Sequence, residues 1–514
     1  MFINIKNRTF NGETAPKSTW VTFCTVGAFK DTIFQFISLF LLLFIQYGTN
    51  LPLDPNYGIY FSVITFGLIF IKTVVLLFAV PLMAHLSNIL KPKLIPGNFR
   101  PWIFYGSLLS MVFFLLMFVN NLNGWAFVIV FLVEYALFEI FFSWNDMGYW
   151  GFFSTMTSIE KTRAKFAAIS SACVAVGAYA LISITPAISG GQASFSIRLI
   201  ALIIAILFVL SSLLLIIVMK EKPINVNYES HYTDCFKIIK NNKYARPALF
   251  ILMCFFAAQF ILMGTSVNLF YYTYGYGDES IYGSLLSSGG FNGVYFIFTI
   301  IYGFSSTLSQ LLYPLINKKF TRKQILTVSI IGLTIMYLLI YFFLSMRANV
   351  YLLFIGVFIL LLFQGQVNSI ILMINNLSIE YNEYICGERR DKDYNGIRSV
   401  FGKFSGGIQT LLFYVFLFAS GLFNLNQAIG NEEAKGVLDS TYDVVGNVNK
   451  LITRTITSSD FDPKLMIYKI LVYLVPMMLM WIILFIYYKF FKLDENEYDR
   501  ILKVIEERKK ENEK

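Results

Sequence analysis

Charged side chains are scarce in this sequence. Only 14% of its 514 residues are Asp, Glu, Lys or Arg, whereas 57% are hydrophobic and the mean hydropathy is +0.64. A soluble domain carries about a quarter charged residues, so a chain of this length and composition is not expected to fold as a globule in water. Lipid is the expected solvent for most of it.

Histidine and cysteine are also scarce. His85 and His231 are too few and too far apart for a zinc site. The five cysteines form no CxxC pair and their number is odd, so no disulfide framework is predicted. The first 23 residues are mostly polar, so no cleavable signal peptide is predicted either. We therefore expect no bound metal and no resident cofactor.

Two further classes of protein are disfavoured. The formal net charge is +10, but the basic residues are scattered between apolar runs and form no stripe that could follow phosphates. Nucleic acid is therefore not an expected partner. A membrane-embedded enzyme is disfavoured because the sequence shows no large soluble catalytic domain, no histidine within a span and no metal-type carboxylate cluster in a loop.

Long apolar runs are what the sequence does contain. A helix needs about 20 apolar residues to cross the hydrocarbon layer, and twelve segments reach this length. The predicted spans are 25–47, 58–84, 101–120, 125–150, 166–188, 197–219, 247–273, 291–315, 325–345, 350–375, 397–422 and 465–491.

The distribution of basic residues gives these spans an orientation. With twelve spans, both tails and every even-numbered loop lie on one side, and 31 of the 41 Lys and Arg residues fall there. The positive-inside rule then predicts that both termini are cytoplasmic. The opposite side carries a long polar segment, 423–464. It is either a small lid or a structureless insertion, and we favour the insertion.

The longest internal cytoplasmic loop, 220–246, divides the spans into two sets of six. We therefore predict an all-α integral membrane protein with one six-helix bundle over 1–219 and a second over 247–492. The tail, 493–514, is predicted to form a solvated or membrane-surface helix. This layout resembles that of major facilitator transporters, whose substrate lies at the midplane between the two halves.

Several ionisable side chains interrupt the predicted spans, where each costs at least about 2.5–3.5 kcal/mol at a helix centre. They are Lys30, Asp31, Lys72, Glu134, Glu139, Asp146 and Lys403. Snorkelling or interhelical ion pairs would explain Lys30 and Glu134. Asp146 is harder to explain in this way, because Tyr149 and Trp150 lie within about one helical turn of it.

Asp146 and Glu139 are seven residues apart and share roughly the same helical face. A carboxylate beside an indole suits a polar ring-shaped ligand. The carboxylate accepts hydrogen bonds from hydroxyl groups, while the aromatic face covers the C–H side of the ring. Sugars fit this description well. Amino acids and organic cations fit it less well, and the residues alone leave them open.

Five stretches occur along the chain in an order typical of one transporter family. They are GAFKDTIFQF (27–36), FRPWIFYGS (99–107), SWNDMGYWGFFSTMTSIEKTRAK (143–165), NLFYYTYGYGD (268–278) and IEYNEYICGERRDKDYNGIRSVFGKFSGG (379–407). Together they resemble motifs of the glycoside–pentoside–hexuronide:cation symporters, the melibiose-permease branch of the major facilitator superfamily.

The resemblance implies roles for particular residues. In the family, aspartates at the positions of Asp31 and Asp146 hold sugar hydroxyl groups, and a tryptophan at the position of Trp150 packs on the sugar ring. Lys403 matches a lysine that lies in the central cavity beside the substrate and cation region. The predicted substrate-binding residues are Asp31, Asp146, Tyr149, Trp150 and Lys403, and the coupling or charge-pair candidates are Lys30, Lys72 and Glu139.

One departure from the family lies in the second span. The family has its sodium- or proton-binding carboxylates one turn apart there, the second directly before a proline. Here the proline is Pro81, and the matching positions hold Leu76 and Val80. A hard cation needs several oxygen ligands, so the usual coupling site is predicted to be absent. Coupling to H⁺ or Na⁺ by another route, or uniport, stays open.

Lys72 lies in the same span, and positions 72, 76 and 80 share one face of a regular helix. Two interpretations follow. Lys72 either forms a plain structural ion pair, which we favour, or acts as a tethered cation that faces Asp146 or Glu139.

Our leading expectation is a secondary transporter that moves a sugar, glycoside or similar polyhydroxylated solute by alternating access. We expect a monomer in the plasma membrane, and the high Ile, Lys, Asn, Phe and Tyr content is typical of an AT-rich bacterial genome. The alternatives are a carrier of an amphiphilic solute such as a lysolipid, or a non-transporting receptor. The candidates for a cytoplasmic gate are Glu160, Arg163, Glu383, Arg389 and Arg390, which ordinary cytoplasmic loop charge would also explain.

Overall fold

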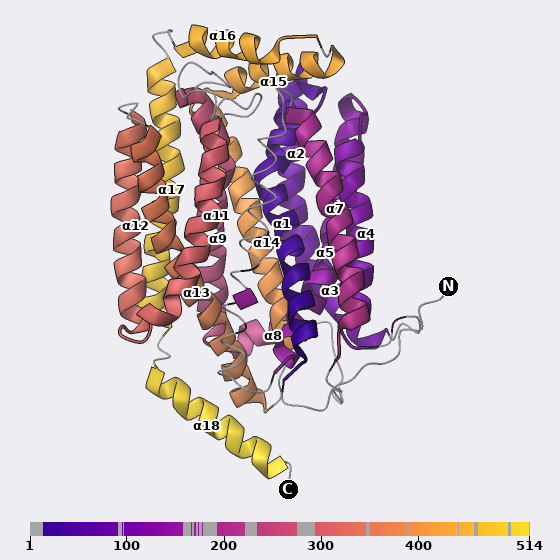
Figure 1. Cartoon of the computed structure of the whole chain (residues 1–514), viewed down its shortest axis with the longest axis vertical. Coiled ribbons are helices and arrows are strands. Elements are labelled where there is room, and N and C mark those ends of the chain that lie inside the picture. Colours follow the sequence, from indigo (N-terminus) through magenta and orange to yellow (C-terminus); the bar gives the residue numbers. More distant parts are fainter. Residues whose placement is uncertain are drawn as a thin grey trace.

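The computed structural model describes residues 14–90, 95, 97–157, 166, 169–170, 173, 177, 193–221, 234–274, 293–345, 350–387, 391–439, 441–456, 461–491 and 495–512. In this part of the chain the regular elements are helices, and an isolated bridge pairs Thr14 with Thr157. Most of the helices are long and run side by side (Figure 1).

The first half of the chain forms one bundle. Its elements are α1 (Lys17–Tyr47), the short η1 (Leu51–Leu53), α2 (Tyr57–Phe70), the π-helical turn η2 (Ile71–Val75), α3 (Leu76–Ile89), α4 (Arg100–Val119), α5 (Gly124–Thr155) and α7 (Ala193–Val218). In this bundle α4 packs against α5 and α7, and α1 packs against α7.

The second half forms the other bundle. Its elements are α8 (Asp234–Asn241), α9 (Ala245–Tyr274), α11 (Gly293–Ile316), α12 (Arg322–Ser345), α13 (Val350–Cys386), α14 (Asp391–Ala419) and α17 (Phe461–Phe490). Here α13 packs against α11 and α12, and α9 packs against α14 and α17. α14 also contacts α2, η2, α3 and α5, so it forms much of the contact between the two bundles.

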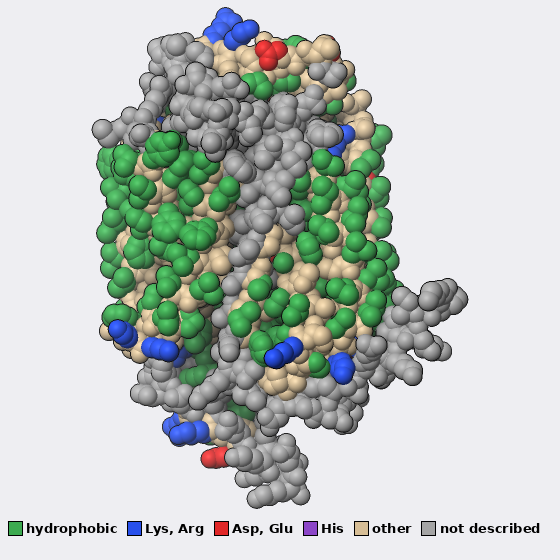
Figure 2. All heavy atoms as spheres, viewed as in Figure 1, with side chains coloured by type: hydrophobic (Ala, Val, Ile, Leu, Met, Phe, Trp, Pro, Cys, Tyr) green, Lys and Arg blue, Asp and Glu red, His purple; other side chains and the backbone are tan. Residues whose placement is uncertain are grey.

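Ten helices of the described chain are long and apolar enough to cross a membrane, and they match ten of the twelve predicted spans. α11 coincides with an eleventh, predicted over 291–315. The fifth predicted span, 166–188, falls mostly outside the described residues. Large apolar side chains such as Phe66, Phe78 and Ile129 are exposed on the outer surface. Figure 2 shows hydrophobic side chains covering much of the flank of the molecule, as expected for a surface that faces lipid.

The segment 423–464 corrects one prediction, because it is not a structureless insertion. It forms α15 (Phe423–Leu438) and α16 (Val444–Ile456), which lie across one end of the bundles (Figure 1). α15 packs against α1 and η1 and buries Asn426, Ile429 and Glu433. Gly421, with φ 70°, permits the turn between α14 and α15.

The C-terminal helix α18 (Glu495–Asn512) lies at the end where α1 begins, opposite α15 and α16 (Figure 1). A helix was predicted for this tail, and its formation is confirmed. Ile501 and Ile505 are buried, and α18 contacts α13. Its apolar side is thus packed on the protein, with Tyr498 donating a hydrogen bond to Glu380 at 2.5 Å.

One close helix contact fixes the position of α5. A β-carbon at Gly106 of α4 would overlap the backbone of Asn145, so a side chain there would force the two helices apart. Asn145 is fully buried and donates a hydrogen bond from Nδ2 to the carbonyl oxygen of Ile103, at 2.8 Å. This contact holds α5 against α4 beside Asp146, the next residue along the chain.

Candidate functional site

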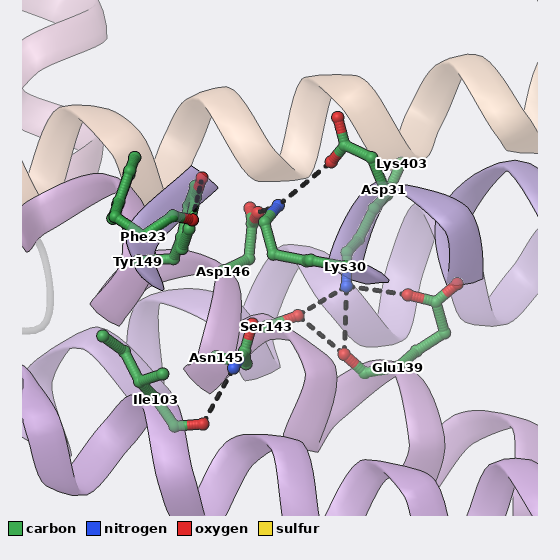
Figure 3. Close-up of polar contacts among 10 residues, drawn as sticks. All are labelled: Phe23, Lys30, Asp31, Ile103, Glu139, Ser143, Asn145, Asp146, Tyr149 and Lys403. Atoms are coloured by element: carbon green, nitrogen blue, oxygen red, sulfur yellow. Dashed lines mark hydrogen bonds and ion pairs between the residues drawn. The ribbon is translucent and has the colours of Figure 1, made fainter. Parts of the chain in front are cut away.

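A cluster of charged side chains lies among the apolar helices, where α1 and α14 meet α5 (Figure 3). In its first part, the ammonium of Lys30 on α1 lies 2.6 Å from Asp146 Oδ1 on α5 and 3.6 Å from Asp31 Oδ1. One buried ammonium therefore bridges the two aspartates that were predicted to bind substrate. The Asp31 side chain is 37% exposed to solvent, and the Asp146 side chain is 17% exposed.

Aromatic rings surround this ammonium. Lys30 Nζ lies 5.2 Å from the ring centre of Tyr149, 5.5 Å from that of Trp150 and 5.9 Å from that of Phe142. These distances permit cation–π attraction. Tyr149 is itself fixed, because its ring stacks on Phe23 at 4.1 Å and its hydroxyl donates to the Phe23 carbonyl oxygen at 3.3 Å. Its hydroxyl group is therefore already used within the N-terminal bundle.

The second part of the cluster joins the two bundles. Lys403 on α14 lies 2.7 Å from Glu139 Oε2 on α5 and donates hydrogen bonds to the Glu139 carbonyl oxygen at 3.0 Å and to Ser143 Oγ at 2.5 Å (Figure 3). The other carboxylate oxygen of Glu139 accepts a hydrogen bond from the Tyr135 hydroxyl at 2.6 Å. The pair is buried and well provided with hydrogen bonds, the condition under which a buried ion pair is tolerated.

Lys72 does not form the structural ion pair that was favoured from the sequence. It is buried, yet among the described residues no carboxylate oxygen lies within 4.0 Å of it, so a plain ion pair is wrong. Its ammonium lies 3.5 Å from the Gly406 carbonyl oxygen on α14 and 5.8 Å from the ring centre of Tyr135. Glu139 attracts it from a greater distance.

The expected regular helix through 72, 76 and 80 is also corrected. The chain makes a π-helical turn over Ile71–Val75, which changes the angular register between Lys72 and the residues that follow. Leu76 and Val80 are fully buried in an apolar cluster with Met147 of α5. Neither side chain carries an oxygen atom, so the predicted loss of the usual cation site stays a prediction.

A small cavity lies beside the second ion pair. Its volume is about 20 Å³, room for about one water molecule. Lys72, Tyr135, Glu139 and Lys403 line it, together with aromatic side chains that include Phe142 and Phe260. A sugar ring is far larger, so a sugar could enter only if side chains or helices moved.

Described residues of the two bundles are in contact at both ends of the interface between them. At the α15 end, the Tyr47 hydroxyl of α1 contacts Asn268 at 3.1 Å and also Asn426 of α15. Tyr272 of α9 donates to the same Asn426 oxygen at 3.3 Å. At the opposite end, buried apolar residues of α3 and α5 pack with residues of α14; they are Leu76, Val80, Ala84, Met147, Tyr394, Ile397 and Val400.

Sequence reasoning missed residues of this site. Arg398 on α14 lies 5.0 Å from the ring centre of Trp150 and interacts electrostatically with Asp146 and Asp31. It stands in the quoted 379–407 stretch but was not selected. Tyr135 could have been found, because it precedes Glu139 by four residues and so shares its helical face.

Of the five candidates for a cytoplasmic gate, the structure describes one. Glu160, Arg163, Arg389 and Arg390 lie outside the described residues. Glu383 is described, and its side chain is buried near the end of α13.

Comparisons with known proteins agree with the motifs. A family model described as MFS/sugar transport protein matches residues 32–457. The raffinose carrier protein of Pediococcus pentosaceus is 25% identical over 405 residues, which cover 74% of this chain and 59% of that protein. The lactose permease of Leuconostoc lactis is 25% identical over 352 residues, which cover 63% of this chain and 51% of that protein. The chain thus spans only 51% to 59% of the length of these two relatives.

Solved structures agree on the fold. The D-xylose–proton symporter superposes with a TM-score of 0.54 at 11% identity, over 90% of this chain and 96% of that chain. The xylose transporter of E. coli in a partially occluded inward-open conformation gives 0.52 at 10% identity, with the same coverage. At this identity the likeness shows the fold alone, which is that of the major facilitator superfamily. The resemblance to the glycoside–pentoside–hexuronide:cation symporters that the motifs predicted is confirmed. The chain is therefore a multi-pass membrane protein that belongs to the MFS/sugar transport protein family.

Proposed function

We propose that this protein is a secondary transporter for a sugar, glycoside or similar polyhydroxylated solute. The observation that carries the proposal is the charged cluster of Lys30, Asp31, Asp146, Glu139 and Lys403 between the membrane-spanning helices. Ionisable groups at this depth are costly and usually mark a solute path. The names of the relatives, a raffinose carrier and lactose permeases, favour a sugar over an amphiphilic solute.

In this proposal Asp146 and Asp31 accept hydrogen bonds from sugar hydroxyl groups. Lys30 holds the two carboxylates in place between solute-binding events, because it contacts both. Trp150 covers the C–H face of the sugar ring. Arg398, on α14 of the other bundle, orients the Trp150 indole. Lys403 pairs with Glu139 across the gap between the bundles.

Alternating access then requires the two bundles to move relative to each other. The contacts between the bundles at both ends are consistent with an occluded arrangement. To open outward, the contacts that Asn426 makes with Tyr47 and Tyr272 must break. To open inward, the apolar contacts between α3 and α14 must part.

The proposed coupling differs from that of the family. Leu76 and Val80 offer no ligand for Na⁺ or H⁺, so we propose that no cation binds at this place. The carrier would then work either as a uniporter or by coupling to protons through another carboxylate. Glu139 is the carboxylate that lines the cavity.

We further propose a bacterial plasma membrane location, both termini in the cytoplasm and a monomeric carrier. α1 begins at the same end of the molecule at which α18 lies (Figure 1). This arrangement supports the proposal that both termini are on the same side of the membrane. Labelling of single cysteines at position 500 in α18 and position 449 in α16, with a membrane-impermeant reagent on intact cells, tests the orientation. We expect labelling only at position 449.

The test of function is uptake by purified protein reconstituted into liposomes. We expect uptake of labelled raffinose or lactose by wild-type protein and its loss in Asp146→Asn. A thermal-shift screen over a wider set of sugars identifies the ligand if neither is moved. A preparation that is folded, yet neither binds nor moves any polyhydroxylated solute, would overturn the proposal.

A further inference from the structure

The small cavity beside Lys403 carries an unbalanced positive charge. The charged side chains that line it are Lys72, Glu139 and Lys403, two cations and one anion. Glu139 gives one carboxylate oxygen to Lys403 and the other to Tyr135. Lys72 is thus left without a carboxylate partner within 4.0 Å in the described chain, although the residue is only 7% exposed.

Neighbouring charges do not compensate Lys72. The next charged groups are Lys30, Asp31, Asp146 and Arg398, which comprise two cations and two anions that interact with one another. Taken together, the described centre therefore has one surplus positive charge, and it resides on Lys72. An ammonium without a carboxylate partner is costly in an apolar interior, and a bound anion would offset that cost.

We propose that this cavity is a binding site for a small monovalent inorganic anion of the size of chloride. The anion would accept a hydrogen bond from Lys72, whereas Lys403, whose three N–H groups are directed at Glu139 and Ser143, would attract it by charge alone. A volume of about 20 Å³ suits a single atom of this kind and excludes a sugar acid in the closed arrangement. The site needs no transported solute, so it stands apart from the proposed sugar transport.

The position of the anion gives it a mechanical consequence. Lys72 belongs to η2 in the N-terminal bundle, and Lys403 belongs to α14 in the C-terminal bundle. An anion bound between them attracts both bundles and stabilises their contact.

The site also has an open side that a substitution can fill. Gly402 lines the cavity, and nothing lies within 4 Å of where its β-carbon would be. A valine at this position would project into that open space while Lys72 stays unchanged. Gly402→Val therefore tests the cavity without removing the charge.

The experiment measures thermal unfolding of the purified full-length protein in sodium chloride against sodium gluconate, at equal sodium and equal ionic strength. We expect chloride to raise the Tm saturably by about 3 °C or more, because a ligand that binds only the folded state stabilises it. Bromide is expected to act like chloride, and sulfate to have no such effect.

Two variants and one control complete the test. Lys72→Met and Gly402→Val should each abolish the response to chloride, and Lys72→Met should unfold in gluconate at a Tm no lower than that of wild-type protein. Lys469→Met is the matched control, because Lys469 is another buried lysine, on α17, that donates to the Leu344 carbonyl oxygen at 2.8 Å. It should keep the response to chloride.

Three outcomes would overturn the proposal. The first is a Tm of wild-type protein that does not change with chloride. The second is a chloride response that persists in both Lys72→Met and Gly402→Val. The third is a response to a sugar acid but not to chloride, which would assign the counter-charge to the solute. Sugar uptake by the same preparation is measured separately, so failure of the anion site and failure of the proposed transport are distinguishable.

Discussion

The two buried ion pairs on α5 differ in what they connect. Asp146 pairs with Lys30 of α1, so both partners belong to the N-terminal bundle. Glu139, two helical turns earlier, pairs with Lys403 of α14 in the other bundle. If the bundles move as units, the first pair can persist through a transport cycle, whereas the second must lengthen or break.

This difference separates binding from movement. The pair within one bundle suits a preformed binding group, since its geometry does not depend on the state of the carrier. The pair between bundles suits a contact that sets the balance between states, since it contributes only when they are close. A third pair, Glu432 with Lys435 at 2.8 Å on α15, is partly exposed and offers a reference for what an ion pair contributes near water.

The largest effect is expected from Asp146→Asn. The variant removes a proposed acceptor for sugar hydroxyl groups and leaves Lys30 buried with only Asp31, 3.6 Å away. Loss of a buried charged partner costs about 2–5 kcal/mol, so uptake should fall about 30-fold or more, at tenfold for each 1.4 kcal/mol. Uptake into liposomes and the Tm are measured together.

The double variant Lys30→Met/Asp146→Asn is the control for this prediction. It removes both charges, so we expect the Tm to recover toward that of wild-type protein while uptake stays lost. Uptake within about threefold of wild type in Asp146→Asn would show that this pair has no role in binding.

Glu139→Gln should have the next largest effect, and of a different kind. The contact between the bundles loses its charge attraction, so we expect turnover to change about tenfold while the Kd for sugar stays within about threefold. Transport rates and equilibrium binding are measured on the same protein. The charge exchange Glu139→Lys/Lys403→Glu should restore part of the lost stability. An equal loss of binding in Glu139→Gln and Asp146→Asn would remove the distinction between the pairs.

Asn426→Leu tests the other end of the contact between the bundles. It removes the acceptor shared by Tyr47 and Tyr272, which should destabilise the closed end by about 1–3 kcal/mol. A cysteine at Ser38, which lines the cavity, should then react faster with a thiol reagent in an otherwise cysteine-free protein. Asn424→Leu, an exposed position on the same helix, should leave the rate unchanged; equal rates in both variants would contradict a sealing role for Asn426.

The smallest effect is expected from Glu432→Gln. Partial burial favours the neutral carboxyl, but hydrogen bonds from Lys435 and Tyr442 outweigh it and hold the pKa of Glu432 below its usual range. The stabilisation is therefore present above the ordinary Glu pKa of about 4.3 and is lost as pH falls below it. For an exposed pair we expect less than about 1 kcal/mol. A Tm difference between variant and wild type that is small at pH 7 and vanishes near pH 3 is the expected result; a loss as large as that of Asp146→Asn would not fit.

Much of the site could be predicted because its residues are conspicuous in an apolar sequence. Asp31, Asp146, Lys403 and Glu139 were selected for their charge within predicted spans, and the structure brings them into one cluster. Arg398 was not selected, because an arginine near the end of a span looks like ordinary loop charge.

The errors have physical causes as well. Segment 423–464 is rich in polar residues, and its helices depend on packing against α1 and η1 rather than on local preference. The π-helical turn at Ile71–Val75 changes the register of Lys72, and nothing in the apolar run around it signals the extra residue in the turn. The missing partner of Lys72 could not be foreseen for the same reason.

The sequence by itself determined that this chain spans a membrane and where most of its helices cross, because transfer of a helix into lipid depends on the local sum of its side chains. Only the tertiary structure decided which charges meet. The partners in the two pairs are 116 and 264 residues apart, and no local pattern fixes contacts over such separations. They arise from the packing of α1 and α14 on α5.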